Sequence, residues 1–273
     1  KEAVFKYGGV QTSIYNALRS SQSSSPYYNK STDAYCYIGT EKPNHDVVIV
    51  GWDDSYSKDN FNTDLEGDGA FICQNSWGDN FGENGFFYIS YYDTNIGTHN
   101  VVYTDIENTD NYDHIYQSDL CGWVGQLGYN KDSIYGANVF TAEGNETLKA
   151  ASFYATGKDS QYELYVVRQF EDETSLEKMI PVASGKLGNA GYYTVDFNQG
   201  IEVDAGERYA VVLYIITPGS VHPMAIEYAA DEATENVDLD DGESYISANG
   251  SKWVSVDTVE KSNLCIKAFS DNR

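Results

Sequence analysis

The sequence predicts a mainly β protein with a short α contribution, an α+β lobe followed by an all-β antiparallel sandwich. Short β-branched and aromatic runs, separated by Gly, Asn, Asp or Pro, recur along most of the chain. Apolar residues at helical spacing are confined to one segment near the N-terminus. At 273 residues the chain is long enough for two domains, each with its own core.

Composition excludes several classes of partner. The chain has 17 basic and 42 acidic residues and a formal net charge of -25. Such a field repels phosphate backbones and anionic lipid surfaces, so we expect no nucleic-acid partner. No apolar run is long enough to cross a bilayer, so no membrane insertion is expected. Residues 1–30 lack the basic start, apolar stretch and cleavage site of a signal peptide, so we expect none in this chain.

The N-terminal elements are predicted from the spacing of apolar residues, which changes from helical to strand-like after residue 32. One helix is expected within residues 4–18, where helical spacing relates Val4, Tyr7, Val10, Ile14 and Leu18, with Gly8-Gly9 as a break. The Ser-rich residues 20–32 predict a loop. Strands are expected at residues 46–52, 70–73 and 85–90, because these runs are apolar and too short for an exposed helix. The polar residues 53–69 predict a surface insertion.

A linker is predicted at residues 105–112, where the sequence turns acidic and loses its apolar residues. The two domains would then span residues 1–104 and 113–273. Beyond the linker, turn residues separate many short β runs and no long helical period intervenes, the pattern of an antiparallel sandwich. The expected strands are 135–140, 148–154, 162–170, 192–197, 208–217, 224–228, 244–248, 253–256 and 264–269.

Two strings carry the chemistry. Residues 43–52 contain His45, and residues 74–86 contain Asn75 and Trp77. An imidazole can take the proton of a thiol and stabilise the thiolate as an ion pair. An amide oxygen can hold the other ring nitrogen so that the ring faces the sulfur. His45 is therefore the candidate base, Asn75 its orienter, and Trp77 a shield of their hydrogen bond from water.

Together the two strings resemble the papain family of cysteine peptidases, with its histidine strand and its Asn-Ser-Trp-Gly block. The resemblance implies that residues 1–104 form the β-rich right-hand lobe of a papain fold. It makes His45 and Asn75 catalytic in peptide-bond hydrolysis by a Cys-His-Asn mechanism, with a protein or peptide as substrate and no cofactor required. Gly9-Val10 resembles the entry to that lobe, which implies that Val10 lines a substrate subsite.

The nucleophile is not expected in this chain. In papain-type enzymes His and Asn follow the Cys by about 130 to 150 residues, which would place it before Lys1. Too few residues separate Cys36 from His45 for Cys36 to be the nucleophile. Cys73 lies in a predicted strand, and Cys121 lies at the start of the second domain. We therefore expect the chain alone to be inactive. Its partner would be the N-terminal peptidase lobe of the same precursor.

The second domain resembles the lectin-like domain that follows a papain-type catalytic domain in bacterial cell-surface cysteine peptidases. The likeness is carried by strand motifs at residues 136–140, 191–196, 244–247 and 263–269. It implies a secreted or cell-surface bacterial protein with a cell-wall glycan as a candidate partner. The alternative hypothesis is a non-catalytic glycan or cell-wall binding module, or a pseudo-peptidase. An aromatic-lined groove on the sandwich, with no open cleft at His45, would favour the binding module.

Calcium is the metal that the acidic loops suggest, because hard cations bind clustered carboxylate and amide oxygens. Neither acidic stretch matches the Asp-x-Asp-x-Asp-Gly calcium loop. A solvated acidic loop is therefore the competing interpretation for both. The candidate ligands are Asp59, Asp64 and Asp68 in the insertion, and Asp238, Asp240 and Asp241 before a strand.

Overall fold

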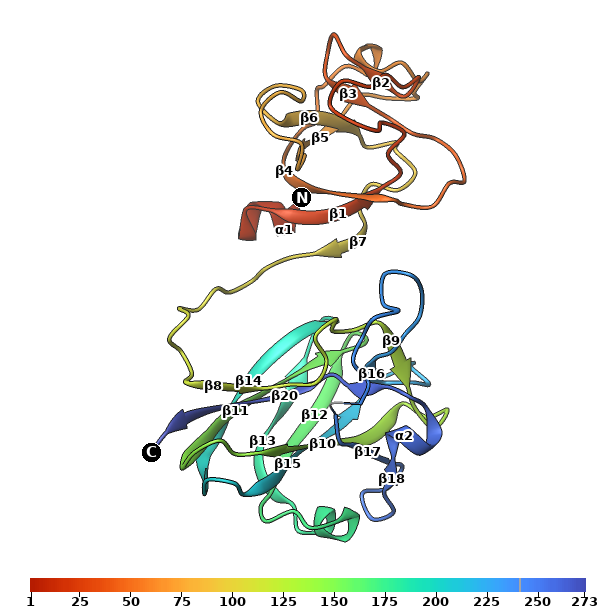
Figure 1. The fold of residues 1–273 in the computed structure, drawn as a ribbon. Helices are drawn as coiled ribbons and strands as arrows, with labels where there is room; N and C mark the ends of the chain where they lie inside the picture. Colours follow the sequence, from red (N-terminus) through yellow and green to blue (C-terminus); the bar gives the residue numbers. More distant parts are fainter. Residues whose placement is uncertain (241) are drawn as a thin grey trace. The chain divides into compact units, whose positions relative to one another are not determined.

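The structure, a computed structural model, describes residues 1–240 and 242–273. It divides the chain into two compact units, Lys1–Glu107 and Asn108–Arg273 (Figure 1). Both are built mainly of antiparallel strands with little helix, which confirms the predicted fold class. Within the described ranges, no helix is long and apolar enough to cross a membrane.

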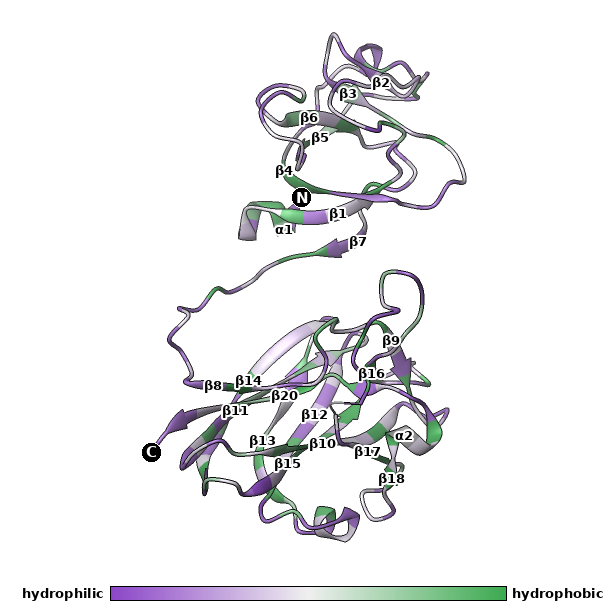
Figure 2. Ribbon diagram, in the orientation of Figure 1, coloured by the Kyte–Doolittle hydropathy of each residue, from purple (hydrophilic) through white to green (hydrophobic). Residues whose placement is uncertain are grey.

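The first unit is built on one seven-stranded sheet in the order β2-β3-β6-β5-β4-β1-β7. Neighbouring strands pair antiparallel, except that β3 and β6 are parallel. The elements are α1 (Glu2–Tyr7), β1 (Val10–Ile14), β2 (Tyr28–Asn29), β3 (Ala34–Tyr35), β4 (His45–Asp53), the 3-10 turn η1 (Lys58–Asn60), β5 (Ala70–Gln74), β6 (Phe86–Ser90) and β7 (Thr98–Val101). Figure 2 shows hydrophobic colour along β4 and hydrophilic colour in many loops.

The predicted helix over residues 4–18 is wrong beyond its first turns. After α1 the chain passes through Gly8, at a φ of 86°, and continues as β1. Val10, Thr12 and Ile14 are buried and form one face of that strand. Every residue of β1 pairs with β4. The pairing decides the conformation, because a short apolar pattern satisfies the helical and the strand period alike.

The core of the first unit gathers on one face of this sheet. Val47 and Ile49 of β4, Cys73 of β5, and Phe87 and Ile89 of β6 are all almost fully buried in one cluster. Val47 and Ile49 therefore point into the core from β4, up to the irregularity in register between Ile49 and Gly51. This packing fixes the strand that carries the site.

The segment between β4 and β5 is not only surface, contrary to the prediction. Phe61 and Leu65 are buried and pack with Ala34, Cys36 and Ala70 in a small cluster of their own. Burying one such side chain contributes roughly 1.5–3 kcal/mol. The two apolar residues anchor a segment whose composition is otherwise polar.

In the described residues of the second unit, the strands form antiparallel sheets of six, four and three strands. Their orders are β13-β12-β15-β10-β17-β18, β14-β11-β20-β8 and β19-β16-β9. The elements are β8 (His114–Tyr116), β9 (Gly125–Leu127), β10 (Ser133–Thr141), β11 (Glu146–Ala155), β12 (Ser160–Val167), η2 (Glu173–Glu177), β13 (Ile180–Leu187), β14 (Gly191–Val203), β15 (Arg208–Ile216), β16 (Met224–Glu227), β17 (Ser244–Ser247), β18 (Val254–Ser255), α2 (Val256–Val259), β19 (Asn263–Leu264) and β20 (Ile266–Asn272).

The two larger sheets share one core. Leu164 and Leu213 of the six-stranded sheet are buried in the same cluster as Phe153 and Ile266 of the four-stranded sheet. The sandwich prediction missed β13, which lies at the edge of the six-stranded sheet. Its Pro181 weakens the strand signal in the sequence, and an edge strand is where a sheet tolerates proline.

Candidate active-site half

His45 and Asn75 lie together at one end of the sheet. β4 begins at His45, and Asn75 directly follows β5. Because Val48 opposes Gln74 in the antiparallel β4–β5 register, the chain leaving β5 passes the start of β4. The side chains meet there, with His45 Nε2 3.0 Å from Asn75 Oδ1. The structure thus brings together the two residues that the sequence predicted as base and orienter.

A second hydrogen bond fixes which atom of the amide faces the ring. The Ser76 backbone N–H donates to Asn75 Oδ1 at 2.8 Å, so the oxygen and not the nitrogen lies toward His45. An amide oxygen only accepts hydrogen bonds. Nε2 must therefore carry the ring proton in a neutral imidazole. Nδ1 is left with a lone pair that can accept a proton.

Aromatic rings pack beside this hydrogen bond. Asn75 is 7% exposed. The Trp77 ring centroid lies 5.3 Å from that of His45 and 5.2 Å from that of Phe81. Exclusion of water by these rings lowers the local dielectric and strengthens the bond between imidazole and amide. The position of Trp77 fits the shielding role that the sequence suggested.

The loop after Asn75 is closed by backbone bonds. The Asn75 N–H donates to Gly85 O at 2.9 Å, and the Glu83 N–H donates to Phe86 O at 2.8 Å. Gly82 has a φ of 55°, and a Cβ built there would lie 2.0 Å from Phe86 O. Glycine is therefore required at this position for the loop to hold Trp77 against the site.

Val10 does not lie opposite His45 in the sheet. Ile14 opposes His45, whereas Val10 opposes Ile49 further along β4. Val10 is 6% exposed and belongs to the core of the first unit. It presents little surface to a substrate in this chain, and its subsite role stays a prediction.

The pKa of each of the four cysteine thiols is raised above its ordinary value. Burial raises the pKa of Cys36 to about 12, and burial also raises the pKa of Cys73 and of Cys265. Cys121 is exposed in the second unit, where desolvation and the Glu227 carboxylate raise its pKa. A reactive cysteine instead has a lowered pKa, because the thiolate is the attacking species.

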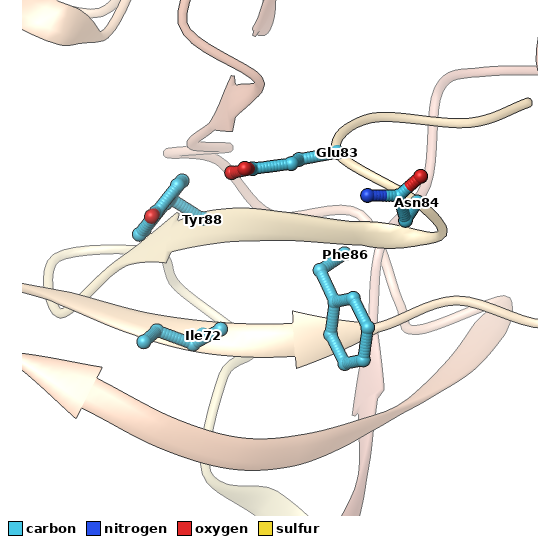
Figure 3. Close-up of a pocket in the computed structure, with 5 residues that line it drawn as sticks. All are labelled: Ile72, Glu83, Asn84, Phe86 and Tyr88. Carbon is cyan, nitrogen blue, oxygen red and sulfur yellow. The ribbon is translucent and has the colours of Figure 1, made fainter. Parts of the chain in front are cut away.

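A small cavity of about 250 Å³ lies elsewhere on the first unit. Its lining contains neither His45 nor Asn75. In Figure 3 the Glu83 side chain extends toward Tyr88. Pockets for drug-sized ligands usually have about 300–1,000 Å³. This cavity is smaller and is not part of the candidate active site. Its lining residues are Ile72, Glu83, Asn84, Phe86 and Tyr88.

The described carboxylates of the predicted acidic loops form no cluster of three or more potential metal ligands. In the part of the chain that the structure describes, no group of three or more His, Cys, Asp or Glu side chains could hold a metal ion. Asp68 accepts a hydrogen bond from the Lys58 N–H at 2.9 Å, and Asp240 pairs with Lys261 at 3.2 Å. Asp241 lies outside the described residues. Calcium binding by Asp59, Asp64 and the other named carboxylates stays a prediction.

Oxygen atoms converge instead on Asn263, which sequence reasoning missed. Its Nδ2 lies 2.7 Å from Ser118 O, 2.8 Å from Asp238 O and 3.0 Å from Glu227 Oε2. A primary amide has only two N–H donors, fewer than these acceptors. If the Asn263 amide were rotated so that its oxygen and nitrogen exchange places, Oδ1 would face the same three oxygens. Four such oxygens are the kind of ligand that hard cations bind. Glu227 and Asn263 are 1% exposed and lie outside the acidic stretch, so composition did not reveal them.

Two family models match the chain. Residues 115–270 match the lectin like domain, and residues 1–106 match the papain family cysteine protease. The first match covers more than half of the chain, so the chain belongs to the lectin-like domain family; residues 1–106 match a C-terminal papain-type peptidase lobe that precedes this domain.

Two solved structures of Cwp84, a surface layer associated protein of Clostridium difficile, are similar over the whole chain. One is a cysteine-to-alanine variant of this clostridial cysteine protease after propeptide cleavage; it is 29% identical, with a TM-score of 0.84. The other contains the cysteine protease and lectin-like domains; it is 27% identical, with a TM-score of 0.80. Both alignments cover 100% of this chain, and they cover 67% and 60% of those chains. No curated protein is significantly similar.

Proposed function

We propose that this chain is the C-terminal part of a papain-like cysteine endopeptidase, with His45 as general base and Asn75 as its orienter. The observation that carries the proposal is the hydrogen bond of 3.0 Å between them, with the Ser76 N–H on the same oxygen. His45 Nδ1 would take the proton of a cysteine thiol, and the thiolate would attack the scissile carbonyl carbon. The imidazolium would then protonate the leaving amine, and water would hydrolyse the thioester.

The thiol would come from the N-terminal lobe of the same precursor. Support comes from the raised pKa of each of the four cysteines in this chain. The Cwp84 chains that are similar to it also extend beyond the aligned part. Because Cwp84 is surface layer associated, we propose a secreted or cell-surface location in a bacterium for this protein too.

Reconstitution tests the proposal. The purified chain, a separately produced N-terminal lobe, and their mixture are each assayed with a chromogenic peptide. Hydrolysis is expected in the mixture and should be blocked by a thiol alkylator. His45→Ala should lower kcat by about 10²–10⁴, the usual contribution of a general base, whereas exchange of the exposed neighbour Gln74→Ala should leave it unchanged. Robust hydrolysis by the chain alone would contradict the two-lobe mechanism.

For the second unit we propose that calcium binds where oxygens surround Asn263. Support comes from the three acceptors within 3.0 Å of an amide nitrogen that has two protons. Calcium should raise the Tm of the metal-stripped chain, because a ligand that binds the folded state stabilises it. Glu227→Gln should remove that increase, and the exposed carboxylate exchange Glu143→Gln should retain it. An unchanged Tm in calcium would rule the site out.

A further inference from the structure

We propose that Asn44 and Asp46, the two neighbours of His45 in the chain, are positioning residues that hold the imidazole in place. Each uses its side chain to fasten the beginning of β4 to β1 or to the residues that follow β1. This inference rests on the proposed peptidase function, because it assigns to both residues an effect on the general base.

His45 stands where the pairing of β1 with β4 ends (Figure 1). It is the first residue of β4 and opposes Ile14, the last residue of β1. In the same register Asn16 would oppose Pro43, which has no N–H to donate to a further rung of the ladder. The ends of paired strands open more easily than their centres. A base at this position therefore needs attachment by groups outside the ladder.

The Asn44 side chain supplies one such attachment. Its Oδ1 accepts from the Asn16 N–H at 2.7 Å, and its Nδ2 donates to Asn16 O at 3.2 Å. The side-chain amide thus pairs with the backbone N–H and C=O of one residue, as a peptide group of a neighbouring strand does. The Asn44 N–H also donates to Ile14 O at 3.0 Å. Three hydrogen bonds therefore fix the residue that precedes His45.

The Asp46 carboxylate supplies the attachment on the other side of His45. Asp46 opposes Ser13 in the register, and its Oδ1 accepts from Ser13 Oγ at 2.7 Å. Its Oδ2 accepts from Gln11 Nε2 at 3.3 Å. Hydrogen bonds to an ionised group are stronger than those between neutral groups. Both donors belong to β1, so the residue that follows His45 is also tied to that strand.

Fixing both neighbours limits how far the His45 ring can move. The ring is bonded at Nε2 to Asn75 Oδ1, and Asn75 belongs to a different segment, the loop after β5. The bond therefore depends on the start of β4 keeping its place relative to that loop. A displacement of about 1 Å can lower the rate of an enzyme by about 10². Asn44 and Asp46 thus act on the reaction through His45.

The ring proton of His45 tests the proposal in the chain alone. NMR spectroscopy measures how fast the proton on Nε2 exchanges with water, which reports opening of the bond to Asn75. We expect about tenfold faster exchange in Asn44→Ala and in Asp46→Ala, the effect of one lost hydrogen bond. The urea midpoint should change little, because both residues are exposed. Asp46→Asn should keep the slow exchange, since its amide oxygen can still accept from Ser13 Oγ.

Asp53→Ala is the matched control for these variants. Asp53 is the last residue of β4, at the end away from His45, and accepts from Ser55 Oγ at 2.7 Å. The substitution removes a comparable hydrogen bond from the same strand. Exchange of the His45 ring proton should therefore be unchanged in Asp53→Ala.

The kinetic arm uses the mixture with the N-terminal lobe and a chromogenic peptide. Asn44→Ala and Asp46→Ala should lower kcat by about tenfold with KM nearly unchanged, because substrate binding does not need an ordered imidazole. Asp46→Asn should restore kcat, since it keeps the attachment to β1 and loses only the charge.

Each outcome decides between the two claims. Unchanged ring-proton exchange in both alanine variants overturns the positioning role, whatever the activity of the mixture, and so does an equal acceleration in Asp53→Ala. Accelerated exchange in the two alanine variants, together with an inactive unchanged mixture, supports the positioning role and contradicts the peptidase function instead. If Asp46→Ala does not fold, Ser13→Ala replaces it, because it removes the donor from the same bond and should also accelerate exchange.

Discussion

At the scale of the single residue, one atom, Asn75 Oδ1, accepts two hydrogen bonds. It accepts hydrogen bonds from the Ser76 N–H and from His45 Nε2, so the backbone of its own loop determines the tautomer of His45. The motif predicted the pair, because residue type and order are visible in the sequence. The tautomer was not predictable, since it depends on a backbone N–H whose direction is set by the folded loop.

Removal of this amide should cost stability as well as activity. Asn75→Ala leaves the Ser76 N–H and His45 Nε2 without their acceptor in a site where Asn75 is 7% exposed. We expect the free energy of unfolding to fall by about 1–3 kcal/mol. Urea unfolding measures it, with exposed Gln74→Ala expected to change stability by less than about 0.5 kcal/mol. Equal effects of the two exchanges would mean that the bond is not formed.

A buried carboxylate in the second unit should make stability depend on pH. Glu146 is fully buried and accepts from Ser270 Oγ at 2.6 Å, from the Tyr116 hydroxyl at 2.8 Å and from the Gly144 N–H at 2.8 Å. Burial acts to raise its pKa, but these donors outweigh burial, and the pKa of Glu146 is lowered overall. Its stabilising effect is therefore present above the ordinary carboxyl pKa, and is lost as the pH falls through the lowered value.

Glu146→Gln tests this dependence. At neutral pH the variant should be less stable by about 1–3 kcal/mol, because an amide cannot accept at both positions. The deficit should shrink as the pH is lowered through the acid range, as measured by urea midpoints at a series of pH values. The exposed neighbour Glu143→Gln should behave as the unchanged chain. If the loss of stability in Glu146→Gln does not vary with pH, the Glu146 carboxyl is not ionised in the folded chain.

At the scale of the element, two glycines in the loop after β5 should differ in how much their exchange for alanine destabilises the protein. Gly82 and Gly78 both have positive φ, at 55° and 74°, but only Gly82 has a backbone atom, Phe86 O, where its Cβ would lie. Gly78→Ala should cost about 1 kcal/mol from the dihedral alone. Gly82→Ala should cost more, about 2–4 kcal/mol, because backbone must also move. The Tm of each variant measures the two costs. Equal costs would mean that Gly82 does not lie against Phe86 O.

The elements show where sequence patterns suffice and where they do not. The central strands of both units were predicted, because each is a continuous apolar run with a clear end. β1 was predicted as helix, since Val10 and Ile14 fit both periods and the deciding contact is with β4. β13 was missed because Pro181 sits in an edge strand. Glu227 and Asn263 are brought together by the fold from separate strands, and no local pattern marks such a pair.

At the scale of the whole molecule, each unit has a core of its own. The end of the first unit lacks regular structure at residues 102–107, where Tyr103 is 72% exposed and Ile106 is 89% exposed. We propose that the predicted linker, residues 105–112, is the most accessible peptide segment. A protease that cleaves after acidic residues should cut there first and yield two stable fragments, identified by mass spectrometry. A first cut at Glu232 or Glu235 would contradict this boundary.

The strand order of the first unit also bears on how it is made. β1 pairs with β4, and β3 pairs with β6, whose residues are synthesised much later. Tyr35 therefore cannot take its place beside Ile89 until β6 has left the ribosome, whereas Val10 and Ile14 need only β4. Such non-local pairing slows folding and exposes nascent chains to aggregation. A chain interrupted before Phe86 would contain both β1 and its partner β4 but would leave β3 without β6, so the sheet of this unit can be completed only near the end of its synthesis.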